Sequence, residues 1–201
     1  MEPEARIMRM LSVLGYPVPS VHAARGREFT MENIAGPTIL DALVGEPAQV
    51  ERYGRQLGEL HERLHRIAAP EWLRPVRGTA ASGAASVLHL DFHPGNVILS
   101  TRGPIVIDWT NAAAGPSELD VALTMLIMLS VDPVDIDMPA LGALRVMFLD
   151  AYLTTCGADP RVGLAAAIEY RLNDPMLPDA ERAWIQTHGA DCLDPFVLGR
   201  P

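Results

Sequence analysis

The sequence predicts an α+β fold in which helices predominate. Apolar residues recur at helical spacing in several long stretches, of which Pro47–Ile67 is the longest. Short apolar runs separated by turns occur at Ser20–Ile34 and Val97–Ile107, and such runs are typical of β-hairpins. The 201 residues and the hydrophobic content of 49% suffice for one large core or for two lobes.

Composition argues against several classes of protein. The net charge of −9 argues against nucleic-acid binding. No apolar segment of a signal peptide follows Met1. The longest apolar run, Val121–Val131, has about half the length that a membrane span requires. The two cysteines, Cys156 and Cys192, are far apart and follow no metal-binding spacing. We therefore expect a cytoplasmic protein that binds neither nucleic acid nor membranes.

The first 34 residues predict one helix and a pair of strands. Apolar residues recur along Glu4–Leu14 at helical spacing, and Gly15 has the position of a C-terminal cap. Ser20–Ala24 and Glu28–Ile34 are predicted strands on either side of an Arg-Gly-Arg turn.

Most of the remaining chain is predicted to be helical. The predicted helices are Ile39–Val44, Pro47–Ile67, a buried helix that starts at Ser117 and contains Val121–Leu129, Leu141–Cys156, Pro160–Leu172 and Asp179–His188. Asp159 and Pro160 form an N-cap followed by proline at the first helical position. Arg74–Ser86, rich in Gly, Ala and Ser, and the Pro-flanked segment Val131–Pro139 are predicted loops.

One predicted helix contains a motif of a different class. Residues 61–65, His-Glu-Arg-Leu-His, match the H-E-x-x-H motif of zinc proteases, in which both histidines share a helix face and bind the metal. No third ligand follows in the expected pattern, and an amphipathic helix rich in His, Glu and Leu produces this motif by chance. We interpret the stretch as a core helix with two half-buried histidines, His61 and His65, and keep a zinc hydrolase as an alternative.

The most informative stretch is Val87–Trp109. A short apolar run leads into a polar loop, His89–Asn96, which holds an acid, two imidazoles and an amide. The chain then forms the hairpin predicted at Val97–Ile107 and ends at a second acid, Asp108. One carboxylate is then able to orient a hydroxyl, while the other and the amide oxygen hold Mg²⁺ against phosphate. The pattern therefore indicates phosphoryl transfer.

The segments HLDFHPGN, residues 89–96, and IDW, residues 107–109, resemble the catalytic and metal-binding segments of the aminoglycoside phosphotransferase and choline kinase family. This resemblance implies a protein-kinase-like fold. It further implies that Asp91 is the catalytic base and that Asn96 and Asp108 bind Mg²⁺. ATP would be the phosphate donor, and a small molecule with a hydroxyl group would be the acceptor.

The resemblance also implies supporting roles for other residues. His89, His93 and Asp120 would support the catalytic loop from behind rather than react. Glu4 lies where the family carries the helix acid that pairs with a nucleotide-binding lysine. Because this sequence contains no lysine, we interpret Glu4 as a first-turn acid favoured by the helix dipole.

A division of the chain follows from the same resemblance. Residues 1–34 would form part of an N-terminal lobe with one helix and two strands, residues 35–38 the hinge, and residues 39–201 a mostly helical C-terminal lobe with the catalytic hairpin. The backbone of the hinge-side residues would face adenine; these residues are Met31, Glu32, Asn33 and Ile34.

The sequence departs from the family at its front. Family members carry three further strands before the first helix, including a nucleotide-covering loop and the phosphate-binding lysine, whereas all 16 basic residues here are arginine. We therefore expect an N-terminally truncated member, from a start codon assigned too late, with impaired activity and with self-association through the exposed N-lobe remnant. A non-catalytic pseudokinase or binding module is the alternative. The acceptor is not indicated, although Glu118, Asp150 and Glu169 are acids in the region expected to bind it.

Overall fold

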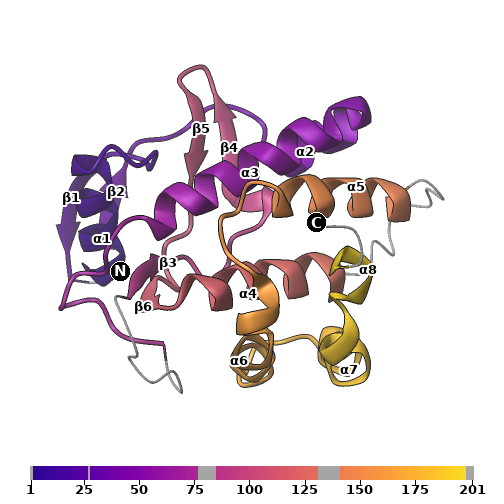
Figure 1. The fold of residues 1–201 in the computed structure, drawn as a ribbon. Helices are drawn as coiled ribbons and strands as arrows, with labels where there is room; N and C mark the ends of the chain where they lie inside the picture. The colour runs from indigo at the N-terminus through magenta and orange to yellow at the C-terminus, as the bar shows by residue number, and fades with distance from the viewer. Residues whose placement is uncertain (1, 27, 77–84, 131–140, 198–201) are drawn as a thin grey trace.

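The computed structural model describes residues 2–26, 28–76, 85–130 and 141–197. In this part of the chain, three two-stranded antiparallel sheets are combined with a larger set of helices (Figure 1). The α+β class and the predominance of helices are confirmed. The two predicted loops lie partly or wholly outside the described residues, at 77–84 and 131–140.

The N-terminal region contains the predicted helix and strand pair. Helix α1, Glu2–Val13, is followed by Gly15, whose φ of 76° is the left-handed conformation that glycine adopts at a helix end. Strands β1, Val21–Arg25, and β2, Glu28–Met31, pair antiparallel. The order of elements therefore agrees with the prediction, although β2 ends three residues earlier than expected.

The packing of α1 differs from what the missing strands led us to expect. Ile7, Met8 and Leu11 are each at most 1% exposed, and they belong to the same hydrophobic cluster as core residues of the C-terminal helices. Among the described residues of α1 and the turn that follows it, Val13 and Leu14 leave large apolar side chains exposed. The apolar face of the helix is therefore covered within the chain, and self-association through this region stays a prediction.

Helix α3, Val50–His65, runs through the centre of the molecule (Figure 1). It follows α2, Ile39–Gly45, and the short 3₁₀ helix η1, Pro47–Gln49, and it packs against α5, Leu141–Leu153. Gly54 and Gly58 permit this close approach, because a Cβ at these positions would lie 2.4 Å from the Phe148 carbonyl oxygen and 2.5 Å from the Tyr152 carbonyl oxygen. The side chains of α3 thereby reach the middle of the core.

Helix α4, Ser117–Ser130, is buried on nearly all sides, as its continuous apolar sequence predicts. Helix α6, Pro160–Leu172, packs across its first turn, and a Cβ on Gly163 would lie 2.2 Å from the Glu118 carbonyl oxygen. Asp159 caps α6 by accepting the Arg161 backbone N–H at 3.0 Å, which confirms the predicted cap. The chain ends with α7, Asp179–His188, η3, Gly189–Asp191, and α8, Asp194–Val197.

Two strand pairs lie on either side of the polar loop. Strands β4, Val97–Ser100, and β5, Gly103–Val106, form the predicted hairpin. Strand β3, Ser86–Leu88, pairs instead with β6, Ala113–Gly115. The sequence predicts no strand at the β6 residues, because three small residues carry no apolar alternation.

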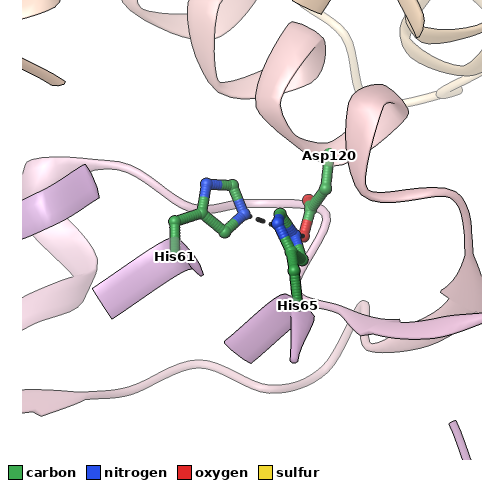
Figure 2. Close-up of side chains that lie close together, drawn as sticks. All are labelled: His61, His65 and Asp120. Carbon is green, nitrogen blue, oxygen red and sulfur yellow. Dashed lines mark hydrogen bonds and ion pairs between the residues drawn. The ribbon is translucent and has the colours of Figure 1, made fainter. Parts of the chain in front are cut away.

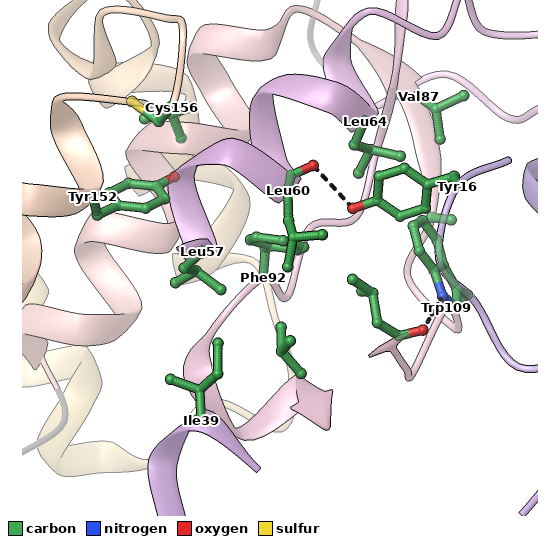
Figure 3. Packing of buried hydrophobic residues seen from close by; sticks show 14 of the residues in the cluster. Tyr16, Ile39, Leu57, Leu60, Leu64, Val87, Phe92, Trp109, Tyr152 and Cys156 are labelled. Carbon is green, nitrogen blue, oxygen red and sulfur yellow. Dashed lines mark hydrogen bonds between the residues drawn. The ribbon is translucent and has the colours of Figure 1, made fainter. Parts of the chain in front are cut away.

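The core fills the space between α1, α3 and the strand pairs (Figure 3). Tyr16 donates its hydroxyl to the Leu60 carbonyl oxygen at 3.1 Å and packs edge-on against Trp109, with ring centroids 5.7 Å apart. The Trp109 indole N–H donates to the Val106 carbonyl oxygen at 3.1 Å. These contacts join the N-terminal region to the segment that carries Asp108. Within the described ranges, no helix has the length and apolar character needed to cross a membrane.

Candidate active site

The polar loop between β3 and β4 places Asp91 and Asn96 in direct contact. The Asn96 side-chain amide donates to the Asp91 carbonyl oxygen at 2.9 Å and to its carboxylate at 3.3 Å. The 3₁₀ turn η2, Pro94–Asn96, closes the loop, and His93 caps this turn by accepting the Gly95 backbone N–H at 3.1 Å. Because the Asn96 nitrogen is directed at Asp91, its side-chain oxygen is left as an acceptor.

The second acid lies beside this loop. The Ile107 backbone N–H donates to the Asn96 carbonyl oxygen at 3.0 Å, which places the following residue, Asp108, next to the end of η2. Burial lowers the pKa of His93, while the charges of Asp91 and Asp108 oppose this shift, so both acids lie near one imidazole. The structure therefore brings the three residues expected for catalysis and metal binding into one site.

Backbone strain is concentrated at this site. Within the described part of the chain, the two non-glycine residues with positive φ are Leu90, at 65°, and Asp108, at 61°. A residue in this conformation costs on the order of 1–3 kcal/mol and persists only where its surroundings impose it. One of these residues directly precedes Asp91 and the other is the second acid itself.

His89 connects the two loops from behind. Its Nε2–H donates to the Ile107 carbonyl oxygen at 3.0 Å, and its Nδ1 accepts the Asp91 backbone N–H at 3.3 Å. Burial lowers the pKa of His89 against the opposing charge of Asp120, so the imidazole is neutral and keeps one proton, on Nε2. His89 is fully buried and braces both acid-bearing segments, as the sequence analysis proposed.

Asp120 supports the loop from the first turn of α4. Its carboxylate accepts the backbone N–H groups of His89 and Leu90, both at 2.8 Å. Burial raises the pKa of this fully buried carboxylate, but its interactions with His61 and His65 outweigh burial and hold the pKa well below the usual range. Asp120 is therefore an ionised anchor directly beneath the strained residue Leu90.

The hinge-side residues lie across from the β4–β5 hairpin. Met31 belongs to β2, and the Glu32 backbone N–H donates to the Ser20 carbonyl oxygen at 2.8 Å. The Glu32 carboxylate pairs with Arg102, in the turn of the hairpin. Among the described residues, the backbone groups of Asn33 and Ile34 have no hydrogen-bond partner. Two of the four residues predicted to face adenine, Met31 and Glu32, therefore already pair with the strand region of residues 20–25.

Glu4 lies closer to the site than the sequence analysis assumed. Burial, followed by the charge of Asp108, raises the pKa of Glu4, against smaller opposing contributions from the Thr110 side chain and the Trp109 backbone. The helix acid of α1 therefore faces the segment that carries Asp108. The position of Glu4 in the family pattern indicated this location. Because the sequence contains no lysine, we interpreted Glu4 as a first-turn acid instead.

His61 and His65 share one face of α3, as predicted, but their side chains are buried more deeply than the expected half-buried pair. His61 is fully buried, the side chain of His65 is 6% exposed, and both direct Nε2 at the Asp120 carboxylate, at 3.0 and 3.1 Å (Figure 2). The three ligand atoms lie within 4.8 Å of one another, so Asp120 occupies the place of the third ligand that the sequence did not indicate. Glu62, the base in a zinc protease, pairs instead with Arg66 at 2.6 Å on the outer side of α3.

A cleft of about 720 Å³ opens beside the catalytic loop. Its walls include Leu90, Arg74, Asn111, Glu169 and Tyr170. The acids Glu118 and Asp150, also suggested for the acceptor, are not among the residues that line it. Of the three acids considered from the sequence, Glu169 is the one that the fold places at this cleft.

Comparison with known proteins identifies the segment around this site. Residues 70–165 match the sequence profile described as the phosphotransferase enzyme family. This range contains Asp91, Asn96, Asp108 and Asp120. No curated protein sequence matches the chain.

Solved structures resemble the chain over nearly its whole length. A choline kinase from Cryptosporidium parvum Iowa II has a TM-score of 0.59 at 12% identity, with 98% of this chain and 78% of that protein covered. A type VIII aminoglycoside-3′-phosphotransferase has a TM-score of 0.51 at 17% identity, with coverages of 96% and 79%. An amicoumacin kinase solved with AMP-PNP and Ca²⁺ has a TM-score of 0.51 at 16% identity, with coverages of 96% and 77%. At these identities the likeness establishes a kinase-like fold.

Proposed function

Because residues 70–165 match the profile of the phosphotransferase enzyme family, we propose that the chain is an ATP- and Mg²⁺-dependent kinase of small molecules. The observation that carries this proposal is the convergence of Asp91, Asn96 and Asp108, which depends on the hydrogen bond from Ile107 to Asn96. An unspecialised hairpin has no reason to combine these side chains with two strained residues at the same place.

Each residue has a chemical role in this proposal. Asp91 is the base that orients the acceptor hydroxyl and takes its proton. Asn96 and Asp108 would hold Mg²⁺, because an amide oxygen and a carboxylate are hard oxygen ligands and the Asn96 nitrogen is already directed at Asp91. When bound, the metal neutralises charge on the phosphate groups. His89 fixes the orientation of both loops.

The nucleotide side is less complete than the metal side. The 201 residues contain no lysine to bind phosphate, so charge neutralisation would rest mainly on Mg²⁺. Asn33 and Ile34 offer backbone groups at the position proposed for adenine. We therefore expect weak nucleotide binding and slow turnover from this chain, and a binding module without catalysis is the second candidate that the lysine-free sequence favours.

The acceptor would enter the cleft beside the catalytic loop. Burial opposes a raised pKa for Arg171, at the end of α6, but the hydrogen bond and charge of Glu181, and then the charge of Asp91, raise it, so Arg171 lies near Asp91. The wall made by α6 therefore extends to the base. A hydroxyl that lies between this wall and Asp91 would be in position for phosphoryl transfer.

The test is Mg²⁺-dependent ATP turnover, followed by ³¹P NMR with a panel of small hydroxyl compounds. We expect Asp91→Asn to lower turnover by at least about 100-fold, because general-base catalysis contributes 10²–10⁴. Asp191→Asn, in an exposed acid of η3, is the matched control and should leave turnover unchanged. Activity that survives Asp91→Asn would contradict the assigned base, and Mg²⁺-dependent binding without turnover would favour the binding module.

A further inference from the structure

The Asp120 carboxylate is shared between the catalytic loop and helix α3. It accepts four hydrogen bonds, two from the backbone N–H groups of His89 and Leu90 and two from the Nε2 atoms of His61 and His65. Figure 2 shows both imidazoles, one helical turn apart, directed at this carboxylate. The geometry joins α3 to the loop through one buried anion.

The hydrogen bonds determine where the two imidazoles carry their protons. An ionised carboxylate only accepts, so His61 and His65 must both carry hydrogen on Nε2. His61 Nδ1 is then free to accept from the Tyr152 hydroxyl, 2.7 Å away. His65 Nδ1 is buried without a partner among the described residues. Both histidines therefore donate to Asp120 from Nε2.

The same protons argue against a metal at this place. A zinc ion would take the Nε2 lone pairs and move each ring proton to Nδ1. In His65 that proton would be a buried donor without an acceptor, which is costly. In addition, Asp120 already accepts two backbone N–H groups. The Asp120 carboxylate is therefore satisfied by N–H donors rather than by a bound metal ion.

We propose that His61 and His65 are positioning residues that orient Asp120 and thereby fix the catalytic loop. Removing either donor leaves the buried carboxylate free to turn away from Leu90, whose positive φ requires a constraint. His61 also stacks on Phe92, the residue after Asp91, with ring centroids 4.2 Å apart. The proposal rests on the proposed function only in calling this loop catalytic.

The test compares two kinds of substitution at each histidine. His61→Leu and His65→Leu remove the donor, whereas His61→Gln and His65→Gln place an amide N–H near the position of Nε2. Leu57→Ala, a fully buried position one turn earlier on α3, is the control for general loss of stability. The readout is hydrogen exchange of the His89 and Leu90 amides by NMR, compared at equal global stability.

We expect exchange of the His89 and Leu90 amides to accelerate about tenfold or more in the Leu variants, as the weakening of a hydrogen bond to a charged group predicts. The Gln variants should restore protection, and Leu57→Ala should leave it unchanged. Where turnover is measurable, the Leu variants should lower kcat with little change in KM. Equal protection in the Leu variants and in Leu57→Ala would overturn the proposal.

A second measurement does not depend on the variants being folded. In the unaltered protein, ¹⁵N spectra should show a proton on Nε2 of both imidazoles, unchanged by added zinc. Stoichiometric zinc binding that removes these protons would overturn the proposal. Neither readout requires activity, so failure to detect phosphotransfer would count against the proposed function alone.

Discussion

The catalytic loop has an outer and an inner face, and the two faces are held by different means. On the outer face, Asp91 and Asp108 are partly or fully exposed, and few protein groups satisfy their oxygens. On the inner face, His89 and Asp120 are fully buried, and Asp120 accepts four hydrogen bonds. The outer groups are thus left available for ligands, while the inner groups are committed to the fold.

This difference assigns stability and function to separate residues. Buried charged groups that lose their partners destabilise strongly. An exposed acid with a strained backbone keeps that conformation only because the rest of the structure imposes it. Replacing such an acid should therefore raise the stability of the protein or change it little. The comparison therefore predicts large stability effects behind the loop and small or favourable effects on its outer face.

The largest effect is expected from Asp120→Ala. This change leaves two backbone N–H groups and two imidazole N–H groups buried without an acceptor. The free energy of unfolding should fall by about 3–5 kcal/mol, as it does when one partner of a buried charged network is removed. Urea unfolding measures this loss. Glu118→Ala, in an acid of the same helical turn outside the network, should cost far less, and equal losses would refute the distinction between the two faces.

The second largest effect is expected at acidic pH, where protonation on the inner face should lower the free energy of unfolding. Burial lowers the pKa of His61 to about 4, against 6.5 in the unfolded chain, despite the opposing charge of Asp120. Between these two values the unfolded state binds more protons, so stability is complete above about pH 6.5 and falls as the pH decreases towards 4. His65 and His89 add to the lowering of this pKa, and the Tyr152 hydroxyl faces the other ring nitrogen.

The expected size follows from the difference of about 2.5 between the two pKa values. At pH 5 this histidine alone should cost about 2 kcal/mol of unfolding free energy relative to pH 7.5. Urea unfolding at the two pH values measures the loss, and His61→Gln removes the titrating group. If the variant shows the same decrease as the unaltered protein, His61 is not the group that responds to acid.

The outer face was largely predictable from the sequence because its residues are close together in the chain. Asp91 and Asn96 occupy one loop, and the Val97–Ile107 hairpin returns the chain to Asp108, so local spacing is sufficient. The helices were predictable for the same reason, since their apolar residues recur within each segment. These features depend on contacts of short sequence separation.

The inner face was not predictable in the same way. His61 and Asp120 are 59 residues apart, and nothing in the H-E-x-x-H motif indicates which acid it contacts. Glu4 and Asp108 are even farther apart in the sequence, so only the fold shows that α1 lies beside Asp108. Strand β6 was missed because its pairing with β3 is set by tertiary structure rather than by its own residues.

The smallest expected effect is the contribution of backbone strain at Asp108 to stability. A pair of substitutions isolates this contribution. Asp108→Gly and Asp108→Ala both remove the carboxylate, but only glycine adopts a φ of 61° without a steric penalty. The left-handed conformation costs an L-residue about 1–2 kcal/mol, and glycine avoids this cost. Part of the resulting gain in stability is lost, because glycine has greater conformational freedom in the unfolded chain. The glycine variant should therefore be more stable than the alanine variant by about 1 kcal/mol. Thermal unfolding monitored by circular dichroism measures the difference, and both variants should lose Mg²⁺-dependent nucleotide binding to the same extent. If the two variants were equally stable, the backbone at Asp108 would carry no strain, and the proposed difference between the two faces would lose this support.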